Sequence, residues 1–170
     1  MELQLSRCFK YPDQVHFYVV TNVTLNNSRK ITVKGDGDLK KLRSAQIVFI
    51  DNFPLLTFPR GIGFTFFGLR ELRIRNCKIE NISFIDLKDC YWLHLLDLTD
   101  NNIMELQVDT FKHCILLEHL FLGGNLVLII DVKMFDYLRR LQTFTINTQY
   151  FKNLQIKEER EKMVMKLAEK

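Results

Sequence analysis

The sequence predicts an α/β repeat solenoid, in which stacked units form one curved parallel β-sheet. Three observations support this class: a 24-residue period, an alternation of apolar residues within each period, and a composition of 25 Leu and 14 Phe against two Ala. Helix bundles use Ala freely because it is the best helix former, so the composition disfavours a bundle. The chain has 170 residues, of which 47% are hydrophobic, and this is enough for one continuous core.

The period is carried by four leucines that are each 24 residues apart, Leu69, Leu93, Leu117 and Leu141. The residues three and five positions later are apolar in every unit, so two side chains of a short strand point to one face. Further matched positions close the unit on its other side, namely Leu87, Phe111 and Phe135, followed by Cys90, Cys114 and Leu138. One unit cannot bury its own apolar edges, and the units must therefore stack.

The ninth position of each unit holds a residue that can stabilise the loop leaving the strand. Cys77, Asn101 and Asn125 occupy this position, and the two Asn side chains can turn inward and hydrogen-bond the backbone. Segments such as LHLLDLTDNNIMELQVDTFKHC resemble the leucine-rich repeat, L-x-x-L-x-L-x-x-N-x-L. The resemblance covers residues 45–154 and implies a leucine-rich-repeat solenoid. Its sheet would be concave, and its convex face would consist of irregular, 3-10 and short helical segments.

The two ends of the chain are expected to differ from the repeats. Residues 1–44 are interpreted as an N-terminal cap followed by a first irregular repeat, and residues 45–156 as the 24-residue repeats. In the cap, two short extended runs around Thr21 and Asn22 predict a β-hairpin that covers the first unit. Residues 157–170 combine Glu-to-Lys spacings with apolar residues at helical spacing, and this pattern predicts a short amphipathic C-terminal helix.

Charge and hydropathy argue against two classes of partner. The net charge is +4, but residues 45–156 hold 11 Lys/Arg against 12 Asp/Glu and are therefore neutral overall. Proteins that bind nucleic acid usually cluster basic residues on one face, so no nucleic-acid partner is expected. No run of about 18 apolar residues is present, so no membrane span is expected either. The first 20 residues lack the apolar core of a signal peptide.

No enzyme is expected, and with it no catalytic residue, metal or cofactor. The sequence contains no nucleophile elbow, phosphate-binding loop or zinc-binding helix motif. Cys77, Cys90 and Cys114 fall in repeat columns, where they are expected to act as small core residues rather than as ligands or nucleophiles. Cys8 lies outside these columns and is a candidate for an intermolecular disulfide.

Three Asn-x-Ser/Thr sequons begin at Asn22, Asn26 and Asn81. Each Asn is a candidate glycosylation site in a chain that enters the secretory pathway. The alternative, for each of them taken singly, is an ordinary turn asparagine.

The concave sheet is the predicted binding surface. Strand residues that point away from the core line up in columns, and these columns mix aromatic, Arg and acidic side chains in a way that core packing does not require. Exposed aromatics beside Arg are common anchors of protein interfaces. The alternative is that Arg73 and Asp97 merely pair across neighbouring strands. The predicted partner-binding residues are Phe49, Asp51, Arg70, Arg73, Arg75, His94, Asp97, Glu118 and Phe121.

A closer resemblance appears ahead of the repeats. The run VHFYVVTNVTLNNSRKITVKGDGDLKKL, followed at once by repeats, resembles the N-terminal region of mosquito leucine-rich immune proteins. The resemblance implies a short or truncated member of an extracellular family, that is, a secreted recognition protein of insect innate immunity. Its implied partner is a complement-like thioester protein or another leucine-rich-repeat chain. The residues alone leave a second function open, that of a cytosolic leucine-rich-repeat scaffold or adaptor that docks a partner protein.

Overall fold

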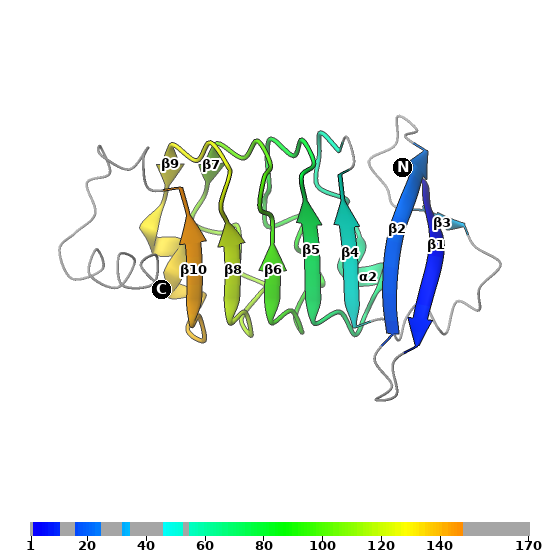
Figure 1. Ribbon diagram of the computed structural model, residues 1–170. Helices are drawn as coiled ribbons and strands as arrows, with labels where there is room; N and C mark the ends of the chain where they lie inside the picture. The colour runs from blue at the N-terminus through cyan, green and yellow to red at the C-terminus, as the bar shows by residue number, and fades with distance from the viewer. Residues whose placement is uncertain (1, 11–15, 25–31, 35–45, 53–54, 148–170) are drawn as a thin grey trace.

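The computed structural model describes residues 2–10, 16–24, 32–34, 46–52 and 55–147 (Figure 1). One eight-stranded sheet runs along the molecule in the order β10-β8-β6-β5-β4-β2-β1-β3. Its five central and C-terminal strands follow the 24-residue period. They are β4 (Ile47–Asp51), β5 (Glu71–Arg75), β6 (Leu95–Asp97), β8 (His119–Leu122) and β10 (Thr143–Ile146).

These five strands are parallel and their register follows the period without a slip. Phe49 pairs with Arg73, Arg73 with Asp97, Asp97 with Phe121, and Phe121 with Thr145. Buried and half-buried residues alternate along β5, because successive side chains of a strand point to opposite faces. Residues that are 24 positions apart in the sequence therefore lie opposite each other in the parallel sheet. The predicted solenoid class is confirmed.

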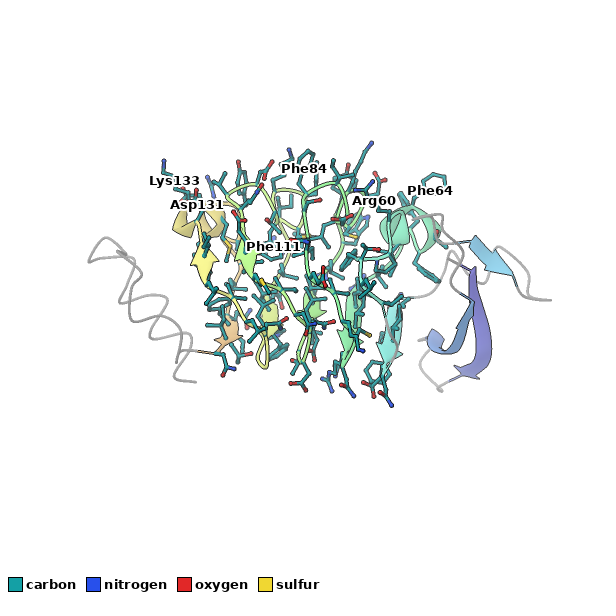
Figure 2. All side chains as sticks on the ribbon, turned by 90° about the horizontal axis from the view of Figure 1, so that it is seen from above. Arg60, Phe64, Phe84, Phe111, Asp131 and Lys133 are labelled. Atoms are coloured by element: carbon teal, nitrogen blue, oxygen red, sulfur yellow. The ribbon has the colours of Figure 1, made fainter. Side chains whose placement is uncertain are left out.

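The convex side is made of short and irregular segments, as the repeat resemblance implied. It contains one turn of helix, α2 (Ile62–Thr65), a 3-10 helix, η1 (Val132–Asp136), and a second small parallel sheet formed by β7 (Glu105–Leu106) and β9 (Ile129–Ile130). In Figure 2 the strands of the main sheet lie along one side, whereas Phe64, Phe84 and Lys133 lie along the other.

One hydrophobic core fills the space between the sheet and the convex side. Leu72 and Ile74 of β5 point into it and are fully buried, as is Phe111 from the convex half, which Figure 2 shows between the two sides. At the C-terminal end of the described core, the rings of Phe135 and Phe144 meet edge to face at 5.2 Å. The contact joins η1 of the convex side to β10 of the sheet.

The N-terminal hairpin exists, but its position differs from the prediction. It pairs β1 (Glu2–Lys10) with β2 (His16–Thr24) in antiparallel fashion, and β2 pairs in parallel with β4. Thr21 and Asn22 therefore lie inside β2, where Asn22 is opposite Gln4, and not in a turn. The β-branched residues on both sides of Asn22 favour a continuous strand and outweigh the turn tendency of one Asn.

The strand order at this end also differs from the expected irregular repeat. A repeat between the hairpin and residue 45 would place its strand next to β4. Instead β3 (Thr32–Lys34) pairs with β1 at the outer edge of the sheet, and β2 takes the position next to β4.

The predicted C-terminal helix, residues 157–170, lies outside the described residues and stays a prediction. Within the described residues, no helix is long and apolar enough to cross a membrane.

Candidate concave binding face

The first half of the concave face is organised around Arg75. Its guanidinium donates from Nε to Oδ2 of Asp97 at 2.6 Å, and its Cζ lies 5.8 Å from the centre of the Phe49 ring. Asp97 is only 2% exposed, and the second oxygen of its carboxylate accepts from the backbone N–H of Thr99 at 3.1 Å and from its hydroxyl at 2.6 Å. Arg75 is therefore held in one position by a buried anion and an aromatic ring.

The simple pair between Arg73 and Asp97, considered above as the alternative to a binding face, does not form. Arg73 lies directly opposite Asp97 in the sheet, but its Nη2 donates to Oε2 of Glu71 on its own strand at 3.1 Å. Arg75, two residues further along β5, reaches Asp97 diagonally instead. Asp97 consequently orients Arg75, and its own carboxylate is too buried to meet a partner.

The second half of the face is aromatic. The rings of His119 and Phe121 stack with centroids 6.4 Å apart and planes 12° from parallel. Nδ1 of His119 lies 3.1 Å from the hydroxyl of Thr143 on the next strand. Leu95 is half-buried on β6, which pairs with the strands of both halves. Two ordered groups, one around Arg75 and one around His119, therefore share a single sheet surface.

The remaining predicted residues flank this surface. Arg70, His94 and Glu118 form a column just ahead of the strands, because the backbone N–H of His94 donates to the carbonyl of Arg70 and that of Glu118 to the carbonyl of His94, both at 2.8 Å. Arg70 is exposed, and Nδ1 of His94 lies 2.7 Å from the carbonyl of Trp92. Asp51 is exposed at the end of β4. Thr99 was not predicted from the sequence, because no motif marks it as a partner of Asp97.

Behind the face, Asn101 forms part of a buried hydrogen-bond ladder. Its Nδ2 donates to the carbonyls of Ile74, Leu98 and Thr99 at 2.8, 2.9 and 3.2 Å, and its Oδ1 accepts from the N–H of Ile79 at 3.2 Å. The amide thereby joins its own unit to the preceding one.

Asn125 repeats this pattern one unit later. It donates to Leu98, Leu122 and Gly123 and accepts from the N–H of Ile103. In the unit before Asn101, the same position holds Cys77, whose thiol lies 3.1 Å from the carbonyl of Arg75. The ladder holds the loops at the ends of the strands that carry the concave face.

The buried thiols are not suited to nucleophilic chemistry. Burial raises the pKa of Cys90 from 9.0 to about 12 and raises that of Cys114 well above 9.0, with a further contribution from the neighbouring Cys90. Both thiols are therefore protonated at neutral pH, and a protonated thiol is a poor nucleophile and metal ligand. Among the described residues there is no group of three or more His, Cys, Asp or Glu side chains that could hold a metal ion.

A set of exposed apolar residues was not recognised from the sequence. Phe67, Tyr91, Trp92 and Ile115 lie in the turns that lead into β5, β6 and β8. We call this set the strand-start edge. The sequence did indicate that these residues belong together, because Phe67, Tyr91 and Ile115 are each 24 residues apart.

Comparison with known proteins places the repeats in a known class. A family model described as leucine rich repeat matches residues 92–155. The human leucine-rich repeats and immunoglobulin-like domains protein 1 is 30% identical over 119 residues, which cover 70% of this chain and 10% of that protein.

Two solved structures share the fold at low identity. A chain of the Toll–Spatzle complex, described as a molecular hub in Drosophila development and innate immunity, matches with a TM-score of 0.55 and 20% identity over 66% of this chain and 15% of its own length. A chain of the TLR13–ssRNA13 complex matches with a TM-score of 0.60 and 21% identity over 80% of this chain and 20% of its own length. The present chain thus spans only a small part of each of these proteins. Together with the 24-residue parallel ladder, these matches identify the chain as a leucine-rich repeat protein.

Proposed function

We propose that this protein is a non-enzymatic recognition module that binds a protein ligand on its concave face. The observation that carries the proposal is the fixed position of Arg75 between the buried Asp97 and the ring of Phe49. A side chain that is already ordered loses little conformational entropy when a partner binds, so more of the contact energy appears as affinity. Arg and aromatic residues are also the most frequent energetic anchors of interfaces.

A protein ligand fits this face better than a nucleic acid. Arg73 and Arg75 both have carboxylate partners, so a phosphate would have to compete with Glu71 and Asp97 for the two guanidinium groups. The aromatic half around Phe121 adds apolar surface, and protein interfaces use such surface in their centre. Single-stranded RNA, the ligand in the TLR13–ssRNA13 complex, is therefore not the ligand class that we propose for this chain.

We further propose a role in insect innate immunity outside the cell. The support is the resemblance of the N-terminal segment to mosquito leucine-rich immune proteins, and the fold shared with Toll. On this proposal the ligand is a complement-like thioester protein or another leucine-rich-repeat chain. Cys8, which lies in β1 opposite Tyr18, is then a candidate for a disulfide to a partner chain. A cytosolic scaffold that uses the same concave face is the competing function.

Replacing Arg73 and Phe121 together by alanine is expected to weaken ligand capture at least about 100-fold, because the first half then loses the guanidinium beside Arg75 and the second half loses the stacked ring. The melting temperature should change by less than about 3 °C, since both side chains are half-buried on the surface of the sheet and the Arg73–Glu71 pair is partly exposed to solvent. Purified insect thioester protein and a second leucine-rich-repeat immune chain serve as immobilised ligands, and a short single-stranded RNA tests the nucleic-acid alternative.

The matched control replaces Lys78 and Leu126, which are exposed beyond the ends of the strands. This pair should leave capture unchanged. Equal binding by the Arg73/Phe121 variant and the unsubstituted chain would rule out the concave face as the binding surface.

Glycosylation at Asn81 is expected when the chain is expressed behind a signal peptide in insect cells. Asn81 is exposed at the edge where the strands end, so a glycan there would not cover the concave face. Intact-mass measurement should show a glycan that is removed by an endoglycosidase and absent from Asn81→Gln. Asn22 lies within β2 and Asn26 lies outside the described residues, so the same spectra should be examined for them. Secreted protein without glycan at any of the three sequons would favour the cytosolic scaffold.

A further inference from the structure

The strand-start edge presents large apolar side chains to solvent. The exposed fractions of Phe67, Tyr91, Trp92 and Ile115 lie between 43% and 62%, although three of the four are aromatic. Scattered apolar residues on a surface need no explanation, whereas a contiguous patch usually marks an interaction site. These four residues therefore indicate an interaction site only if they form a contiguous patch.

The backbone shows that they do. Three residues after Phe67 comes Arg70, whose carbonyl accepts the N–H of His94, and the carbonyl of His94 accepts the N–H of Glu118. The turns that carry Phe67, Tyr91 and Ile115 are thus tied side by side, at about the 4.8 Å spacing of neighbouring strands. The four residues thus form a row across three successive units, with one exposed apolar residue in each unit, or two at Tyr91 and Trp92. The Tyr91 ring also meets the His113 ring edge to face at 5.8 Å.

The rim of this row carries excess positive charge. Arg70, Lys88, Arg139 and Arg140 are exposed next to it, and none of them forms an ion pair or side-chain hydrogen bond within the part of the chain that the structure describes. Three carboxylates lie among them, those of Asp89, Glu118 and Asp136, the last in the same repeat column as Lys88. Four cations against three anions leave the rim with a small positive excess, which favours an acidic partner over a basic one.

We propose that the strand-start edge docks an amphipathic helix of another protein, with apolar anchors along one stripe and Asp or Glu beside them. The turns of an α-helix repeat every 5.4 Å, close to the spacing of the repeat units, so a helix lying across the units places one anchor near each unit. The acidic flank meets Arg70 on one side and Arg139 and Arg140 beyond Ile115. This surface adjoins the flank of the concave face, with which it shares Arg70 and Glu118.

The opposite edge of the solenoid serves as an internal comparison. Leu56, Met104 and Leu128 are exposed there at equivalent positions of their units, but the unit between Leu56 and Met104 has Glu80 at this position. A charged residue therefore interrupts this row, and Asn81, the candidate glycosylation site, follows directly. These residues are as exposed as those of the strand-start edge and are also apolar, but they do not form a continuous apolar row.

Trp92 provides the measurement, because it is the only tryptophan of the chain and lies within the row. The probe is a designed peptide of about 18 residues with Leu and Phe at helical spacing and Glu and Asp on the flanks, and its counterpart carries Lys and Arg in place of the acids. Titrating the acidic peptide into the 170-residue chain should shift the Trp92 emission to shorter wavelength in a saturable way. The basic peptide should bind at least about tenfold more weakly.

Two double variants distinguish docking from a nonspecific effect. Tyr91→Ser with Ile115→Ser should weaken binding of the acidic peptide at least about tenfold, whereas Met104→Ser with Leu128→Ser should leave it unchanged. All four side chains are exposed, so both variants are expected to fold, and circular dichroism serves to check this.

Four results would overturn the proposal. The first is equal affinity for the two peptides, and the second is equal loss of binding in the two double variants. The third is an emission shift that follows protein concentration without peptide, which would indicate a second copy of this chain. The fourth is a shift with phosphatidylserine vesicles but with neither peptide, which would indicate a membrane surface.

Discussion

Replacing Asn101 by alanine is expected to lower the free energy of unfolding by about 3–5 kcal/mol. The substitution removes the acceptor of the buried Ile79 N–H and the Asn101 donor to the carbonyl of Ile74. The carbonyls of Leu98 and Thr99 also lose a donor, but they keep those from Asn125 Nδ2 and the Asn76 N–H. A buried polar group without a partner costs its full desolvation penalty, about 1–3 kcal/mol each. The loss should appear as a lower midpoint in urea unfolding, followed by circular dichroism.

Two controls accompany this variant. Asn102→Ala, at the adjacent exposed position, should change the free energy of unfolding by less than about 0.5 kcal/mol. Asn101→Cys places at this position the residue that occurs naturally as Cys77 one unit earlier, so its loss should be smaller than that of alanine. If Asn101→Ala and Asn102→Ala had the same midpoint, the ladder would contribute nothing measurable to stability.

Replacing Phe111 by alanine is expected to lower the free energy of unfolding by a comparable amount, about 3–5 kcal/mol. Phe111 is fully buried between the sheet and the convex side, and its removal leaves a cavity that the irregular convex segments fill only in part. Thermal and urea unfolding both report the loss.

The repeat itself supplies the control for this variant. Leu87 occupies the equivalent position one unit earlier and is also fully buried, so Phe111→Leu should cost only about 1–2 kcal/mol. Phe64→Ala, at an exposed convex position, should be nearly neutral. An equal loss for Phe64→Ala and Phe111→Ala would contradict the assignment of Phe111 to the core.

The repeat spacing alone predicted which strand residues lie opposite each other. Phe49, Arg73, Asp97 and Phe121 share one row because each strand begins 24 residues after the last, and this follows from counting. Which charges pair was not predictable in the same way. Arg75 reaches Asp97 diagonally because its side chain is long, and Asp97 turns inward because Thr99 donates to it. Such choices depend on side-chain length and local donors rather than on period.

The N-terminal segment shows a second limit. Alternation of apolar residues identified extended structure in residues 15–25, but it did not distinguish one nine-residue strand from two short strands separated by Thr21 and Asn22. The pairing partner decides between them, since β1 continues alongside β2 past Asn22. A partner distant in sequence carries no local signal.

The strand-start edge was missed for a different reason. Its residues recur with the same period as the core residues, and an apolar side chain in a turn does not itself reveal whether it is exposed.

The hydrogen bonds of the Asn ladder depend on the order in which the chain is synthesised. The N–H of Ile79 finds its acceptor in Asn101, and the N–H of Ile103 finds its acceptor in Asn125, in each case 22 residues further along the chain. During synthesis, the loops that contain Ile79 and Ile103 therefore cannot complete these hydrogen bonds until the following unit has been made. The N–H of Ile79 and the N–H of Ile103 each acquire their buried acceptor only after the following unit has been synthesised.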